Sequence, residues 1–260
     1  QLKYIFHHKE KKMTYSVALA GKGGTGKTTT AGMLVKYLVE KGKTPVLAVD
    51  ADANANLNEV LGLEAGETLG DAREDMKTGV SPGMTKDIYM EMKLQEAIVE
   101  SKGFDLIVMG RPEGSGCYCA ANTLLTQYLE KLMDNYRYLV VDNEAGMEHI
   151  SRLTTNNIDV LLVVSDATRR GLQAAHRIVE LTDALKLNIS KKVVMVNRAK
   201  PGQSEALDEA LSQYKMDFIG TVPEDAEVQL FDLEGRPTVE LPSENEAMKA
   251  AYRIFDKIIP

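Results

Sequence analysis

The sequence predicts an α/β fold in which a doubly wound, mostly parallel sheet carries helices on both faces. Three observations predict it: continuous Val, Ile and Leu runs recur along the chain, helix-period segments separate them, and a glycine-rich turn follows the first run. Continuous apolar strands are typical of parallel sheets, because the crossover helices bury both faces of such a sheet. Ligands of these folds bind at the carboxyl ends of the strands.

Seven apolar runs are expected to be the strands of this sheet, since each is short, continuous and rich in Val, Ile or Leu. They lie at residues 17–20, 45–49, 106–109, 138–141, 160–164, 193–196 and 218–219. After the first run and its turn, residues 28–41 place apolar side chains at helical spacing and predict the first helix. This alternation predicts a layered sheet with crossover helices.

Two further segments are expected to be helical. Residues 54–101 are rich in charge and methionine and interrupt the strand rhythm, so they are expected to form an inserted helical lobe. Residues 244–259 gather their apolar side chains on one helix face and mix acidic with basic side chains on the other. A lipid-binding helix is usually strongly basic on its polar face, so packing of this helix on the sheet is favoured.

The length of 260 residues suits a single α/β domain, which we expect to span residues 13–260. Residues 1–12 precede a plausible initiator, Met13, and we expect them to be an upstream extension or a remnant of an expression vector. No apolar run approaches the roughly 20 residues that cross a bilayer, so a cytoplasmic protein without a membrane partner is expected. The formal net charge of −7 disfavours nucleic acid as a partner.

The glycine-rich turn between the first strand and the first helix is the strongest functional signal. Its glycines let successive backbone N–H groups point toward an oxyanion, and the helix adds its positive end. Lys27 is placed for the outer phosphates of a nucleotide and the Thr28 hydroxyl for Mg²⁺, whereas a chance glycine-rich turn is the weaker alternative. The residues expected to bind the nucleotide here are Gly21, Lys22, Gly23, Gly24, Thr25, Gly26, Lys27, Thr28 and Thr29.

The pattern G-K-G-G-T-G-K-T includes a second lysine, Lys22, that an ordinary phosphate loop does not need. It resembles the deviant Walker A loop of the MinD, ParA, ArsA and nitrogenase-iron-protein ATPases, which belong to the SIMIBI class of P-loop NTPases. The resemblance implies that Lys22 reaches the nucleotide of a partner subunit, so that a homodimer encloses two ATP molecules. It also implies catalytic roles for Lys22 and Lys27.

Two other strand ends resemble the switch segments of this family. In the first, Asp50 and Asp52 follow a strand, and the resemblance implies that Asp52 orients the attacking water while Asp50 lies in the Mg²⁺ shell. The alternative is an Asp-rich helix start. In the second, Asp142 resembles the aspartate that holds Mg²⁺ through water. Residues 144–146 read Glu-Ala-Gly, where the family more often has Pro-Ala-Gly.

The turn after the strand at 193–196 bears on the choice of base. Guanine recognition in this superfamily uses Asn-Lys-x-Asp, and the equivalent turn here reads Asn-Arg-Ala-Lys, without the aspartate. The resemblance therefore implies ATP, with Mg²⁺, as the nucleotide. The residues implied to contact adenine are Asn197 and Arg198, with Pro223, Glu224 and Asp225 in a loop that closes over the base.

Both cysteines of the chain, Cys117 and Cys119, stand in one C-x-C in a glycine-rich stretch. A disulfide at this spacing would be strained and out of place in the cytosol. Two thiolates are half of a tetrahedral site, and sulfur ligands select Zn²⁺, Ni²⁺, Cu⁺ or iron–sulfur clusters. A two-fold dimer would bring two such motifs together. The alternative is that both cysteines are small buried residues.

The stretch R-P-E-G-S-G-C-Y-C-A, combined with the deviant loop, resembles the CooC and AcsF nickel-insertion ATPases, and the likeness extends over nearly everything after Met13. It implies that Cys117 and Cys119 bind Ni²⁺ or Zn²⁺ at the dimer interface. It also implies ATP-driven delivery of the metal to apo carbon monoxide dehydrogenase or apo acetyl-CoA synthase. Two alternatives stay open: an electron-transfer reductase like the nitrogenase iron protein, and a spatial-organising ATPase of the MinD or ParA kind.

Overall fold

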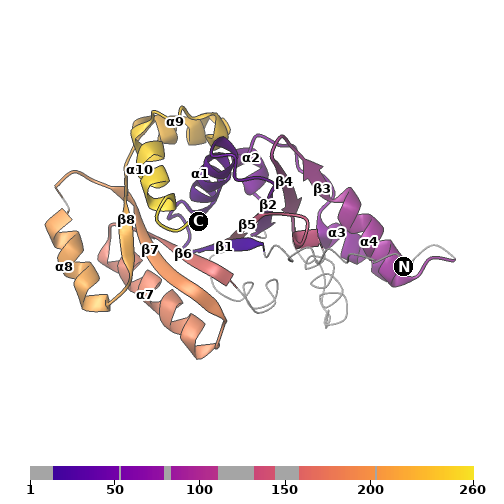
Figure 1. Cartoon of the computed structure of the whole chain (residues 1–260), viewed down its shortest axis with the longest axis horizontal. Helices are drawn as coiled ribbons and strands as arrows, with labels where there is room; N and C mark the ends of the chain where they lie inside the picture. Colours follow the sequence, from indigo (N-terminus) through magenta and orange to yellow (C-terminus); the bar gives the residue numbers. More distant parts are fainter. Residues whose placement is uncertain (1–13, 53, 79–82, 111–131, 144–157, 203) are drawn as a thin grey trace, which may run out of the picture.

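The computed structural model describes residues 14–52, 54–78, 83–110, 132–143, 158–202 and 204–260. Within them an eight-stranded sheet lies between layers of helices (Figure 1). The strand order is β3-β4-β2-β5-β1-β6-β7-β8. The strands are β1 Tyr15–Ala20, β2 Val46–Ala51, β3 Ile98–Glu100, β4 Phe104–Val108, β5 Tyr138–Asn143, β6 Ile158–Asp166, β7 Ile189–Ala199 and β8 Phe218–Pro223.

The pairing confirms the predicted fold class and all seven predicted strands. Every described pair is parallel except β3 with β4, which is antiparallel. The sequence pattern did not predict β3, and its residues fall in the segment 54–101, where only helices are expected. A strand of three residues carries too little periodicity to be recognised, and β3 exists because its backbone pairs with β4.

Helices cover both faces of the sheet. In β1, Val17 and Leu19 point to one face and Ala18 and Ala20 to the other, as the two-residue repeat of a strand requires. The first face is covered by α1 Lys27–Glu40, α2 Leu57–Val60, α9 Ala226–Glu234, the 3₁₀ turn η1 Thr238–Glu240 and α10 Glu246–Phe255. The second face is covered by α3 Leu69–Thr78, α4 Lys86–Glu96 and α7 Arg169–Ala184, with α8 Ser204–Tyr214 beside α7.

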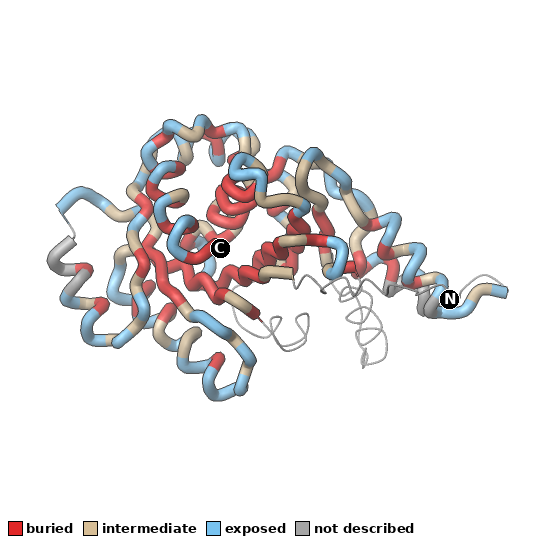
Figure 2. The backbone as a smooth tube through the Cα atoms, in the orientation of Figure 1, coloured by how far each residue is buried: buried red, intermediate tan, exposed pale blue. Residues whose placement is uncertain are grey.

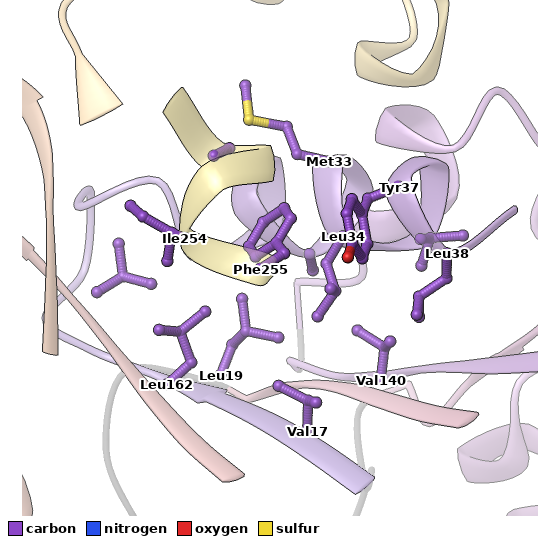
Figure 3. Packing of buried hydrophobic residues seen from close by; sticks show 14 of the residues in the cluster. Val17, Leu19, Met33, Leu34, Tyr37, Leu38, Val140, Leu162, Ile254 and Phe255 are labelled. Carbon is purple, nitrogen blue, oxygen red and sulfur yellow. The ribbon is translucent and has the colours of Figure 1, made fainter. Parts of the chain in front are cut away.

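The deepest packing lies between the sheet and the pair α1 and α10. Figure 2 shows buried residues along the central strands and α1, and Figure 3 shows the side chains that meet there. The Tyr37 ring packs edge to face against Phe255 with 5.5 Å between centroids, and its hydroxyl donates to Asp256 over 2.7 Å. The expected packing of the C-terminal helix against the core is thus confirmed. In the part of the chain described, no helix is long and apolar enough to span a bilayer.

The position of β1 determines where a ligand can bind. The chain leaves β1 for β2 on one side of it and later passes to β6 on the other side, with β5 inserted between β1 and β2. The carboxyl end of β1 is therefore a topological switch point, and open α/β sheets bind their ligands in the crevice beyond such a point.

Candidate functional site

The glycine-rich loop occupies this switch point, between the end of β1 and the start of α1. Gly21 is buried at φ +156°, and a Cβ placed on it would lie 2.3 Å from the carbonyl oxygen of Val164 on β6. Any larger residue at position 21 would push the loop away from the sheet. Lys22, Gly23 and Gly24, by contrast, are exposed at the surface.

The helix that follows the loop begins without a side-chain cap. Gly26 is its N-cap residue, in the left-handed region at φ 88°, and no acidic residue stands in the first turn. The first N–H groups of α1 thus keep their capacity to bind an anion, as expected at a phosphate site. Lys27 is buried, and its Nζ makes one long contact of 3.5 Å with the carbonyl oxygen of Lys22. The loop is held by Thr25, whose hydroxyl donates to the same carbonyl over 2.9 Å.

Two carboxylates lie side by side beneath the loop. Asp50 at the end of β2 is the direct partner of Asp142 in the parallel pairing with β5, and the two side chains are 0% and 1% exposed. Asp50 accepts hydrogen bonds from the backbone N–H groups of Asp52 and Leu57. Burial is the main cause that raises the pKa of Asp50 to about 6 and that of Asp142 to about 7.

Asp142 has the features of a cation ligand. Its Oδ1 atom is buried without a hydrogen-bond partner among the described residues, while the carboxylate receives a hydrogen bond from Thr28. A buried oxygen without a donor is costly unless a cation or water is bound to it. The hydroxyl and carboxylate oxygens here are of the type that Mg²⁺ prefers, so the residues present fit a magnesium ion.

Asp52 lies half-buried at the edge of this group. Its Oδ1 accepts a hydrogen bond from the backbone N–H of Asn54 over 2.8 Å, and its own N–H donates to Asp50. The sequence-predicted set Lys27, Thr28, Asp50, Asp52 and Asp142 is therefore brought together by the ends of three adjacent strands and the start of one helix.

A pocket opens beside the loop, toward β8 and α9. Five of the residues predicted to bind nucleotide line it, namely Thr29, Asn197, Arg198, Pro223 and Asp225. Its other walls are formed by Thr30, Met33, Val222, Val228, Gln229, Asp232 and Ala247. The sequence pattern did not predict the pocket residues of α9, Val228, Gln229 and Asp232, because nothing in their spacing indicates that they face a ligand.

Two of the residues predicted to contact the base, Glu224 and Asp225, form hydrogen bonds within the protein. The Asp225 carboxylate caps α9: its Oδ1 accepts from the N–H groups of Glu227 and Val228 and from the amide of Asn245. Glu224 does not line the pocket; it accepts a hydrogen bond from Gln229 over 3.1 Å. The sequence could have revealed the cap, since aspartate before a helix is a common N-cap.

Asn197 and Arg198 make hydrogen bonds that the sequence did not predict. The Asn197 amide donates to the carbonyl oxygen of Thr25 over 2.9 Å, and the Arg198 guanidinium donates to that of Gly24 over 3.2 Å. Both residues therefore line the pocket and also contact the glycine-rich loop.

The predicted metal ligands Cys117 and Cys119 lie outside the described residues, as do residues 144–146 of the second switch. Within the described ranges no group of three or more His, Cys, Asp or Glu side chains is arranged to hold a metal ion. The C-x-C site therefore stays a prediction.

Comparison with known proteins agrees with this geometry. A family model described as the CobQ/CobB/MinD/ParA nucleotide binding domain matches residues 16–239. An uncharacterized ATP-binding protein of Methanocaldococcus jannaschii is 43% identical over 94% of this chain and 98% of its own. The carbon monoxide dehydrogenase accessory protein CooC of Rhodospirillum rubrum is 31% identical over 84% of this chain and 87% of its own. The solved structure of MinD from Aquifex aeolicus, 22% identical, has a TM-score of 0.70 and covers 95% of this chain and 97% of that one, which shows a shared fold.

Proposed function

The chain belongs to the CobQ/CobB/MinD/ParA nucleotide-binding family, and on that premise we propose that it is an ATP-hydrolysing metallochaperone that delivers nickel to carbon monoxide dehydrogenase or acetyl-CoA synthase. One observation supports ATP binding and hydrolysis above all. The phosphate loop, the buried pair Asp50 and Asp142, and the adjoining pocket lie together at one edge of the sheet. The proposed delivery of nickel is supported by the C-x-C motif of Cys117 and Cys119 and by the similarity to CooC.

In the proposed reaction the chain's own groups bind and orient the triphosphate. The loop N–H groups and the start of α1 hold the phosphates, and a phosphate oxygen would replace the weak carbonyl contact of Lys27. Thr28, Asp142 and Asp50 would hold Mg²⁺, which when bound neutralises charge on the phosphates. The Asp52 carboxylate would orient the attacking water.

For ATP binding and hydrolysis to drive metal delivery, the dimer must have two geometries. Their relative populations would differ between the ATP state and the ADP or empty state, and the shared sulfur site would be intact in only one of them. Each protomer would supply Cys117 and Cys119, so that two protomers complete a four-sulfur site. ATP would thereby control the affinity for nickel or zinc.

Metal titration of the full chain tests this proposal. We expect about one Ni²⁺ or Zn²⁺ ion per dimer, bound by four thiolates, and loss of that binding in the double variant Cys117→Ser, Cys119→Ser. Calorimetry under reducing, oxygen-free conditions gives the stoichiometry. His176→Gln removes an imidazole outside the motif and should leave the binding unchanged. Undiminished affinity in the cysteine double variant would eliminate the proposed site.

Lys22 tests the proposed dimer. Its side chain is exposed in the isolated chain, so Lys22→Ala should leave the fold intact. We expect the variant to lose most of the dimerisation that Mg-ATP induces, because the cation that reaches the partner's nucleotide is gone. Light scattering with and without Mg-ATP measures it, and Lys41→Ala, another exposed lysine, is the control. Equal association of Lys22→Ala and the unmodified protein would contradict the bridging role.

Two other functions use the same nucleotide fold. A reductase like the nitrogenase iron protein would carry an iron–sulfur cluster, which absorbs broadly in the visible under anaerobic conditions, whereas Zn²⁺ does not. A spatial-organising ATPase of the MinD or ParA kind would sediment with liposomes or DNA in the presence of ATP. The first result would favour electron transfer, and the second would favour spatial organisation over metal delivery.

A further inference from the structure

Two consecutive side chains at the end of β7 hold two consecutive carbonyl groups of the phosphate loop. The Asn197 Nδ2 donates to the Thr25 carbonyl over 2.9 Å, and Arg198 Nη1 donates to the Gly24 carbonyl over 3.2 Å. These contacts join segments that lie 172 and 174 residues apart in the sequence. Neither contact is part of the regular pairing of the sheet.

The planarity of the peptide group gives these contacts a directional effect. In a trans peptide the C=O and N–H bonds point in opposite directions. Holding the Gly24 carbonyl therefore orients the Thr25 N–H, and holding the Thr25 carbonyl orients the Gly26 N–H. Both N–H groups belong to the loop expected to surround the phosphates. In the structure the Thr25 N–H donates to the Lys22 carbonyl over 3.4 Å, a long hydrogen bond that a phosphate oxygen would have to replace. The orientation of such N–H groups is the property that makes the loop an anion site.

Close packing shows that the Asn197 contact is built into the loop. A Cβ on Gly26 would lie 2.4 Å from Asn197 Nδ2, so the amide fits only because residue 26 has no side chain. The amide oxygen of Asn197 in turn accepts a hydrogen bond from the Arg198 N–H over 2.9 Å. The amide has two N–H donors and two oxygen lone pairs, so among the contacts of the described residues one of each remains for a base.

Arg198 lies at an irregularity in the pairing of β7 with β8, whose register shifts between Val196 and Ala199. Its φ is 55°, in the left-handed region that costs a non-glycine residue on the order of 1 kcal/mol. From this position the guanidinium reaches the Gly24 carbonyl.

Asn197 and Arg198 also line the pocket beside the loop, together with Pro223 and Val228. From this shared position we infer that Asn197 and Arg198 are positioning residues for the phosphate loop, and that they link occupancy of the base pocket to the orientation of the loop N–H groups. The inference rests on the nucleotide site of the proposed function and does not depend on metal delivery. The role inferred for Asn197 and Arg198 goes beyond contact with adenine.

Inorganic tripolyphosphate separates the two roles, because it has phosphates and no base. We expect Asn197→Ala to weaken binding of Mg-tripolyphosphate about five- to tenfold, and Mg-ATP by at least the same factor, since one loop hydrogen bond is lost. Asn197 is uncharged, so the change does not alter the attraction between charges. Calorimetry on the full chain, with melting temperatures to verify the fold, measures both ligands.

Val228→Ala is the matched control. Val228 lines the same pocket, and none of the hydrogen bonds described for the loop involves its side chain. We expect this variant to weaken Mg-ATP a few-fold and leave Mg-tripolyphosphate unchanged. If Asn197→Ala behaves like Val228→Ala, with tripolyphosphate affinity unchanged, Asn197 reads only the base and the inference is wrong.

Arg198→Ala provides a second variant, which is the safer one to fold because the residue is exposed. Loss of a direct phosphate contact would make tripolyphosphate binding less dependent on salt, whereas loss of loop positioning lowers the affinity at each salt concentration by the same factor. We expect the second pattern, again with a loss of about fivefold. A flattened salt dependence, or unchanged affinity, would overturn the role of Arg198.

Failure of this inference can be distinguished from failure of the proposed function. Absence of any ATP binding by the unmodified chain would contradict the nucleotide site itself. Absence of nickel or zinc binding would contradict the metallochaperone proposal and leave the comparison between tripolyphosphate and ATP intact.

Discussion

Replacing Lys27 with alanine is expected to reduce ATP turnover by about 100-fold or more. Lys27 is the buried cation at the start of α1, and removal of a preorganised electrostatic contact to a transferring group typically costs a factor of about 100 to 1,000. Its single described hydrogen bond is the 3.5 Å contact with the Lys22 carbonyl, so the fold should tolerate the change. Steady-state phosphate release measures the effect.

Lys41→Ala is the matched control for this experiment. Lys41 follows the same helix at its carboxyl end and is exposed, about 14 residues from the loop, so turnover should equal that of the unmodified protein. Nucleotide affinity of the Lys27 variant should fall as well, because the cation also contacts the ground-state phosphates. Turnover that survives Lys27→Ala would mean that hydrolysis does not occur at this loop.

Asp142→Asn is expected to have opposite effects on stability and on nucleotide binding. The asparagine retains the size of the side chain and removes a buried charge whose Oδ1 lacks a partner in the described structure. Relief of such a charge should stabilise the ligand-free protein by about 1–3 kcal/mol, or about 3–10 °C in Tm for a chain of this size. The same change removes one of the three proposed cation ligands, so Mg²⁺ should strengthen ATP binding less than it does in the unmodified protein.

The difference in stability between Asp142→Asn and the unmodified protein should grow as the pH rises. Burial raises the pKa of Asp142 to about 7 from 3.8, and the nearby Lys27, Asp50 and Asp52 modify it further. Between these pKa values the unfolded chain has lost the proton while the folded chain retains it, so stability falls as pH rises toward 7 and then levels off. The asparagine variant lacks this loss. Its advantage should therefore be smaller at pH 5 than at pH 7.5.

Differential scanning calorimetry in EDTA measures the stability, and repeating it with Mg-ATP measures the ligand effect. Asp217→Asn, an exposed aspartate, should change neither. A lower Tm for Asp142→Asn in EDTA would show that the carboxylate is stabilising without a cation, contrary to the argument from its burial.

The sequence predicted the sheet well because each central strand carries its own local pattern. β5 and β6 are continuous apolar runs that require burial on both faces, whatever their neighbours are. β3 has no such pattern, since its three residues become a strand by pairing with β4. The order of the strands is likewise a tertiary property. That Asp50 and Asp142 end on adjacent strands follows from the insertion of β5 between β1 and β2.

The candidate site shows the same contrast between features encoded locally in the sequence and features that arise from tertiary structure. The phosphate loop is contiguous, so the spacing of its glycines and lysines was sufficient to predict it. The contacts of Asn197 and Arg198 with the loop were not predictable, because they depend on how the end of β7 meets a turn about 170 residues earlier. Asp225 shows a third case: its position in the sequence fits both a base contact and a helix cap, and in the structure it caps α9 and also lines the pocket.

The contacts at Gly24 and Thr25 have a consequence for how the molecule acquires its binding capacity during folding. The segment 14–41 contains every backbone group of the cradle, yet two of its peptide groups are oriented by residues that the ribosome adds much later. A nascent chain that ends before β7 would hold the loop sequence without its anchoring. Ligand affinity should therefore emerge late in synthesis, and a bound nucleotide would fasten the first strand of the chain to its seventh.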